Sequence, residues 1–158
     1  MTSLITSIPL ATFLLFGLRS IVIDLQVHRL PNKLTVRLTL LVLVSEIATS
    51  SVLRDWSQWQ PMLETLFWIS VIYLVIYALS RNSLGFGDVK FAIPCAVTIG
   101  WYAPGQWTNF LWVSFGCAAL VAIMFWLTGK ASRSSPIAFG PFMYFGVLIV
   151  ATNALLSG

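Results

Sequence analysis

Charged residues are scarce in this chain. Asp, Glu, Lys and Arg make up 9% of its 158 residues, and 58% are hydrophobic, whereas about a quarter of the residues in a typical soluble domain are charged. This scarcity excludes an ordinary soluble domain and makes a bilayer the natural solvent. The net charge of +4 would suggest nucleic acid in a soluble protein. Here we expect the positive charges to set membrane topology instead, and no nucleic-acid partner.

Cysteine and histidine are also rare. Cys95 and Cys117 lie in apolar stretches without CxxC spacing, which indicates neither a zinc site nor a thiol relay; we interpret them as small buried side chains. The single histidine, His28, is interpreted as an interfacial side chain. With no His or Cys cluster beside the carboxylates, we expect no metal and no cofactor.

Basic residues are absent from the first part of the chain, since no Lys or Arg precedes Arg19. A cleavable signal begins with a basic region. We therefore expect the first apolar run to remain in the protein.

Long apolar runs, in contrast, are abundant in the chain. A spanning helix needs about 20 mainly apolar residues, and loops rich in Pro, Gly, Asn and charge divide the sequence. The six runs are Leu4 to Leu25, Val36 to Leu53, Met62 to Ser80, Val89 to Ala103, Trp107 to Thr128 and Ala138 to Leu156. The fourth is the shortest and contains Pro94. The pattern predicts an all-α fold: one domain over residues 1–158, a polytopic membrane bundle of about six transmembrane helices.

The basic residues are distributed unevenly over the loops. Those near the loops after the first, third and fifth runs are Arg29, Lys33, Arg37, Arg81, Lys90, Lys130 and Arg133. Only Arg54 falls on the other side. Because cytoplasmic loops are enriched in Lys and Arg, we expect a multi-pass protein of the inner (plasma) membrane with both termini outside.

Aromatic residues agree with this orientation. Trp56, Trp59, Trp101 and Trp107 are then expected near the outer interface, where tryptophan is commonly found.

The five carboxylates are functional candidates, because charges in or near hydrocarbon are costly. Asp55 and Glu64 lie in or beside the second loop, where water solvates them, and we assign them no chemistry. Glu46 lies inside the second run. It faces a polar cavity, a partner helix or the outer boundary, and we expect a structural role.

Asp24 closes the first run and Asp88 opens the fourth. The end of one span and the start of the third span after it lie on the same membrane face, so the two carboxylates can meet at one depth. An aspartic protease needs this geometry: one ionised carboxylate takes a proton from water, and one protonated carboxyl polarises the scissile carbonyl. Such a pair titrates as a coupled unit.

Gly85 and Gly87 precede Asp88. Without a Cβ they permit positive φ and close approach of an extended substrate. Each aspartate also has a simpler interpretation: Asp88 as the N-cap of its helix, and Asp24 as a charge paired with Arg19 or Arg29.

Three separated segments together resemble the type IV prepilin peptidase family. The first is Asp24 followed by residues 29–35, RLPNKLT, where the family commonly has Ile in place of Leu30. The second is residues 85–90, GFGDVK, similar to the family's GxGDxK. The third is residues 136–142, PIAFGPF, similar to a Pro-Phe-Gly-Pro-Phe segment but one residue longer. Their order and spacing agree across nearly the whole chain.

The resemblance implies an aspartic endopeptidase with Asp24 and Asp88 as its catalytic pair. The family cleaves the basic leader of its substrates after a glycine at the cytoplasmic face. The implied partners are prepilin, pseudopilin or preflagellin-like proteins and the lipid bilayer.

The remaining motif residues have both a site role and a simpler interpretation. Gly85, Gly87 and Lys90 carry over as residues of the second motif, although Lys90 also fits a snorkelling anchor. Pro31 and Asn32 fit a turn into the second span. Residues Gly140 and Pro141 fit a break or bend at the start of the last helix.

The chain departs from the family pattern in the loop between the first two helices, and this bears on whether it is also a methyltransferase. Many family members carry a cytoplasmic insert with paired CxxC motifs between the first two helices and also methylate the new N-terminus. Here that loop has about ten residues and no cysteine. The chain resembles the short forms of tight-adherence pilus systems or of archaeal preflagellin processing, and we expect a peptidase without methyltransferase activity.

Two other interpretations stay open. One is an intramembrane GxGD protease of the presenilin or signal-peptide-peptidase kind, although those place a Tyr-Asp pair where this chain has Ile23 and Asp24. The other is a non-enzymatic channel or transporter subunit that uses Asp24 and Asp88 for protons or cations.

Overall fold

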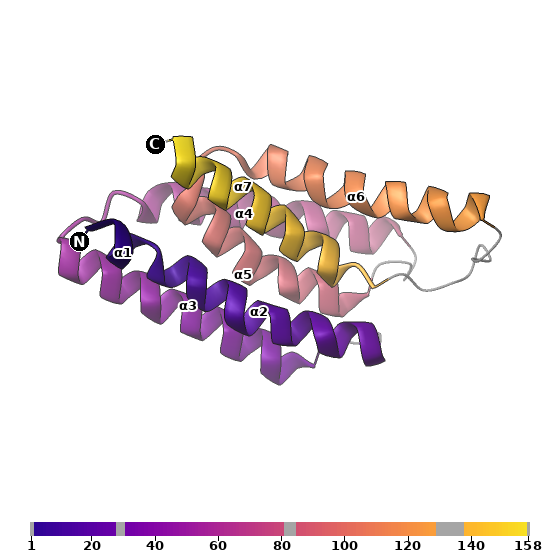
Figure 1. Cartoon of the computed structure of the whole chain (residues 1–158), viewed down its shortest axis with the longest axis horizontal. Coiled ribbons are helices and arrows are strands. Elements are labelled where there is room, and N and C mark those ends of the chain that lie inside the picture. Colours follow the sequence, from indigo (N-terminus) through magenta and orange to yellow (C-terminus); the bar gives the residue numbers. More distant parts are fainter. Residues whose placement is uncertain (1, 28–30, 81–84, 129–137, 158) are drawn as a thin grey trace.

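A computed structural model describes residues 2–27, 31–80, 85–128 and 138–157, which form an all-helical bundle and confirm the predicted fold class. Among the described residues, five helices are long and apolar enough to cross a membrane, which fits a multi-pass membrane protein. The helices lie side by side, with the N- and C-terminal ends at the same end of the bundle (Figure 1). The helices are α1 (Thr2–Thr6), α2 (Ile8–Val27), α3 (Asn32–Leu53), α4 (Trp59–Leu79), α5 (Phe86–Tyr102), α6 (Trp107–Leu127) and α7 (Gly140–Ser157).

The predicted boundaries differ from the observed ones where polar residues belong to a helix. Helix α3 starts at Asn32, four residues before the apolar run, because Pro31 is its N-cap in an extended conformation and the backbone bonds begin there. The first run is divided into α1 and α2 near Pro9, whose ring nitrogen has no hydrogen to donate to the preceding turn.

Helix α5 is the core of the bundle. It has 17 residues, of which 11 are buried, and it contacts α2, α3, α4, α6 and α7. Its small buried residues Ala92, Ala96 and Gly100 recur every four positions, a spacing that lets membrane helices approach closely. An ideal Cβ on Gly100 would lie only 2.5 Å from the Cα of Met62. The backbones of α4 and α5 are therefore in direct contact.

The outer surface of the bundle is apolar. Large side chains such as Leu79, Trp112 and Leu156 are 77%, 78% and 87% exposed. Exposed apolar side chains of this size are expected where helices face lipid rather than water.

Tryptophans gather at the end of the bundle that carries the termini. The ring of Trp59 lies 5.7 Å from that of Trp56 and 6.1 Å from that of Trp101. Trp107, at the start of α6, stacks on Trp68 at 6.0 Å.

Candidate active site

The end of α2 and the start of α5 meet at the end of the bundle opposite the termini (Figure 1). Asp24 lies one turn before the end of α2 and is 4% exposed, and Asp88 is half-buried in the first turn of α5. The two carboxylates are close enough to interact electrostatically. The structure thus brings together the two residues that were predicted to meet.

Asp88 is the third residue of α5, and Gly85 is the N-cap. The backbone N–H of Gly85 donates a hydrogen bond to the Asp88 carboxylate, as the acidic residue of a capping box does. The simpler interpretation of Asp88 as the N-cap itself is therefore wrong, although its carboxylate does help to cap the helix.

The glycines before Asp88 do not use positive φ. Gly85 has φ −67° and ψ 140°, and Gly87 lies within the first turn of α5. The close approach is observed at Gly85, where an ideal Cβ would lie 3.3 Å from Oδ2 of Asp88. Glycine here leaves room for the carboxylate beside the backbone.

Lys90 joins two of the sequence motifs. Its Nζ donates a hydrogen bond of 2.7 Å to Oδ1 of Asn32 and lies 4.4 Å from the ring centroid of Phe86. The start of α3 is thereby linked to the first turns of α5. Lys90 is not simply a snorkelling anchor, and Asn32 does more than follow the turn at Pro31.

The third motif reaches the same region through aromatic rings. Gly140 and Pro141 are the first two residues of α7, as expected of residues that mark a helix start. Just before them, the ring of Phe139 lies 4.9 Å from Phe115 and 6.3 Å from Tyr73. Pro136 and Ile137 lie outside the described residues.

Tyr73 is a candidate that the sequence analysis missed. It is fully buried on α4, and its hydroxyl has no hydrogen-bond partner among the described residues. The hydroxyl is close enough to Asp88 to interact with its charge. A tyrosine inside an apolar run is itself a signal, because a hydroxyl in a membrane interior needs a partner.

Asp55 and Glu64 are exposed. The N–H of Ser57 donates a 2.9 Å hydrogen bond to Asp55, which lowers the pKa of that carboxyl. This bond belongs to a turn between α3 and α4, at the end of the bundle away from Asp24.

Glu46 is fully buried on α3 and faces the bundle interior. Neither of its oxygens accepts a hydrogen bond from the described residues. It interacts electrostatically with Tyr102, whose hydroxyl bonds to the carbonyl of Thr6 and to the N–H of Leu10. Glu46 thus lies inside the bundle, near the tyrosine that ends α5. Its structural role stays a prediction.

Arg19 and possible metal ligands were the remaining features considered around Asp24. Within the described part of the chain, Arg19 forms no ion pair, so it does not pair with Asp24. In the same residues, no three His, Cys, Asp or Glu side chains gather as ligands for a metal ion. Positions outside the described residues include His28, Arg29, Arg81, Lys130 and Arg133.

Comparison with known proteins shows which family the chain is similar to. A model of the type IV leader peptidase family matches residues 10–126, which include Asp24 and Asp88. Leader peptidase HopD of Escherichia coli is 36% identical over 83 residues, which cover 49% of this chain and 49% of that protein. The match thus spans about half the length of that relative. No solved structure shows a significant match.

Proposed function

This chain belongs to the type IV leader peptidase family, and from that premise we propose that it is a membrane aspartic endopeptidase with Asp24 and Asp88 as its catalytic pair. Its substrates are prepilin, pseudopilin or preflagellin-like proteins, whose basic leader it cleaves after a glycine. The observation that carries the proposal is the placement of buried Asp24 beside Asp88 at one end of the bundle.

The chemistry follows from two carboxyl groups that share one proton. The ionised carboxylate takes a proton from a water molecule, and the water oxygen attacks the carbonyl carbon of the scissile peptide bond. The protonated carboxyl donates a hydrogen bond to the carbonyl oxygen. Collapse of the tetrahedral intermediate breaks the C–N bond, and a proton passes from the pair to the leaving nitrogen.

Tyr73 is proposed as a third group of this site. A buried hydroxyl without a hydrogen bond costs about 1–3 kcal/mol, so an acceptor supplied by the substrate would remove that cost. We assign this acceptor to the carbonyl oxygen of the scissile segment, which gains negative charge during attack. The position of the hydroxyl near Asp88 supports the assignment.

The active site is proposed to face the cytoplasm. Among the described residues, Lys33, Arg37 and Lys90 are near the end that holds Asp24, and Arg54 is at the opposite end of α3. This asymmetry favours a cytoplasmic site. The short connection between α2 and α3, residues 28–31, leaves no room for a CxxC insert, and we propose no methyltransferase activity.

The test is cleavage of a prepilin whose basic leader ends in glycine, by purified protein in lipid, beside Asp24→Asn and Asp88→Asn. Each variant should insert and fold but lose nearly all turnover, and the double variant should be little worse than either, because the pair acts as a unit. Asp55→Asn is the matched control, since Asp55 is an exposed carboxylate that should leave cleavage unchanged.

Two results would contradict the proposal. Near-normal cleavage by either single variant would remove the dyad assignment. A folded parent that cleaves no prepilin in several lipids, yet carries protons or cations, would favour the transporter interpretation.

A further inference from the structure

Two arginines from neighbouring helices line one small cavity on the outside of the bundle. Arg19 of α2 and Arg37 of α3 border a space of about 140 Å³. Ser20 is also at its wall, and the rest of the lining is Phe16 and three leucines of α3. The cavity therefore has cationic groups set in an apolar surround.

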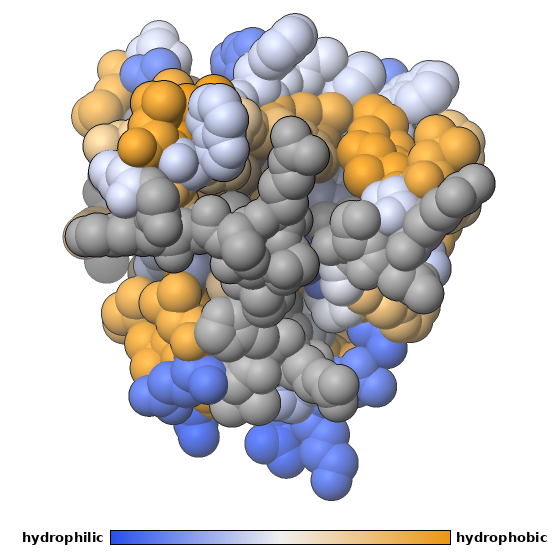
Figure 2. Space-filling view, turned by 90° about the vertical axis from the view of Figure 1, so that its right-hand side faces the viewer, coloured by the Kyte–Doolittle hydropathy of each residue, from blue (hydrophilic) through white to orange (hydrophobic). Residues whose placement is uncertain are grey.

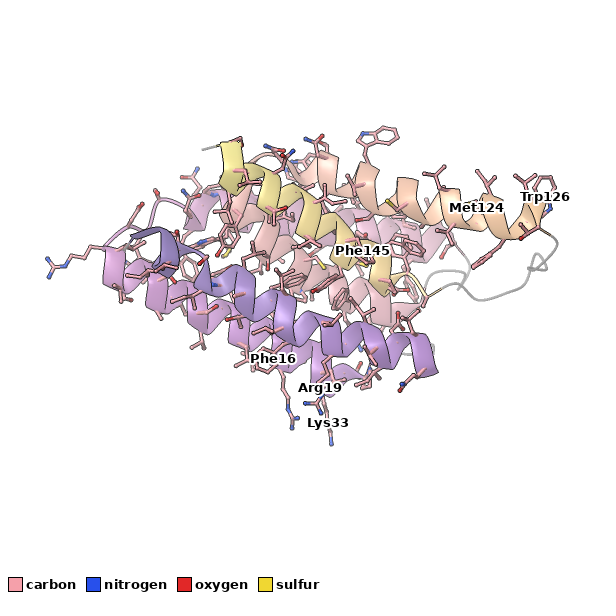
Figure 3. All side chains as sticks on the ribbon, viewed as in Figure 1. Phe16, Arg19, Lys33, Met124, Trp126 and Phe145 are labelled. Carbon is pink, nitrogen blue, oxygen red and sulfur yellow. The ribbon has the colours of Figure 1, made fainter. Side chains whose placement is uncertain are left out.

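Like charges at one cavity repel each other. Arg19 and Arg37 are exposed, and within the described residues neither forms an ion pair with a carboxylate. Lys33 lies one turn before Arg37 on α3 and adds a third positive charge. Figure 3 shows Phe16, Arg19 and Lys33 on the same outward side of the α2–α3 pair.

The end-on view agrees with this placement. Figure 2 looks onto the end of the bundle opposite the termini, where hydrophilic side chains gather along the lower edge and apolar ones lie on the flanks above them. The α2–α3 pair forms the lower edge of the bundle in Figure 1. Among the described residues, Arg19 and Lys33 lie on this lower side (Figure 3).

The depth of the arginines fits a lipid phosphate. At 1.5 Å per residue, Arg19 is about 12 Å from the end of α2 and Arg37 about 7.5 Å from the start of α3. Their long side chains can reach the level where headgroups meet hydrocarbon, and basic pockets between membrane helices suit anionic headgroups.

We propose that Arg19 and Arg37 bind the phosphate of an anionic phospholipid, with an acyl chain against Phe16 and the leucines of α3. Lys33 strengthens the attraction. A basic leader is repelled by these same cations, which separates this site from the one proposed for the substrate. The inference does not depend on the proposed peptidase activity.

The test compares the parent with the double variant Arg19→Gln, Arg37→Gln, using phosphatidylglycerol, phosphatidylcholine and inorganic phosphate as separate probes. Native mass spectrometry measures lipid retention, and thermal unfolding measures stabilisation. The parent should retain phosphatidylglycerol and gain stability from it. Binding should weaken about fivefold for each arginine removed, as expected for roughly 1 kcal/mol per cation.

Arg54→Gln is the matched control, because Arg54 is the cation at the other end of α3 and its loss should leave phosphatidylglycerol binding unchanged. If the double variant has the same unfolding temperature as the parent in phosphatidylcholine, it is folded. Equal retention of phosphatidylglycerol by the parent and a folded double variant would overturn the inference. Equal stabilisation by inorganic phosphate would also overturn it, by showing a site for the free anion.

Discussion

At the scale of the residue, Tyr73 differs from phenylalanine by one oxygen atom that is buried without a hydrogen bond to the described residues. Tyr73→Phe should lower the kcat of leader cleavage on the order of 100-fold, as removal of a donor to a developing oxyanion does. The same change should leave the unfolding temperature unchanged or raise it, since it removes an unsatisfied buried group that costs about 1–3 kcal/mol. Single-turnover cleavage and thermal unfolding measure the two effects.

Tyr77→Phe is its control. Tyr77 lies one turn further along α4, half-buried, with its ring 5.3 Å from that of Phe86. Tyr77→Phe should cleave the leader at the same rate as the parent. If Tyr73→Phe cleaved at the parent rate, or lost stability instead of activity, the hydroxyl would have a structural role only.

Part of the site could be predicted from the sequence at this scale. Asp24 and Asp88 lie at the same end of the bundle because helix ends alternate between two faces, which depends only on the number of spans between them. The bond from Lys90 to Asn32 could not be predicted, because it joins side chains 58 residues apart whose rotamers depend on how α3 and α5 pack. For Tyr73 the hydroxyl in an apolar run was a visible signal, but its closeness to Asp88 depends on how the helices pack.

At the scale of the element, the contact between α4 and α5 depends on Gly100. A Cβ there would lie 2.5 Å from the Cα of Met62 and 2.9 Å from the Cβ of Thr65. Gly100→Ala should therefore separate the helices and cost about 1–3 kcal/mol, as overpacking does. It should also reduce cleavage, because these two helices carry Tyr73 and Asp88.

Gly116→Ala provides the comparison, since nothing lies within 4 Å of the corresponding Cβ on α6. Alanine should be neutral or slightly stabilising there, because it favours helix over glycine by about 1 kcal/mol. Thermal unfolding of both variants in the same lipid measures the difference. Equal unfolding temperatures would show that α4 and α5 have room between them.

Apolar runs predicted the existence of the long helices better than their ends. Helix α3 includes Lys33 and Arg37 in its first turns because backbone hydrogen bonding starts after Pro31, whatever the hydropathy of the side chains. Helix α5 likewise starts at Phe86, before the apolar run at Val89. Its Gly85–Asp88 bond is a local signal that hydropathy does not detect.

At the scale of the whole molecule, the prediction concerns the orientation of the chain in the membrane. In a background with Cys95 and Cys117 replaced by alanine, Arg133→Cys should react with an impermeant thiol reagent only from the cytoplasmic side. Asp55→Cys should react only from the outside. The charge asymmetry gives the reason, since basic loops stay in the cytoplasm. Reaction of residue 133 from the outside alone would reverse the topology.

The hydrogen bond from Gly85 to Asp88 makes this carboxylate part of the start of α5, in addition to the catalytic role proposed for it. An alanine at position 88 would remove both at once, so an inactive Asp88→Ala protein would not reveal which loss mattered. The amide oxygen of asparagine can still accept the bond from Gly85. Asp88→Asn, which has nearly the same shape as the parent residue, therefore distinguishes loss of catalysis from loss of structure at the start of α5.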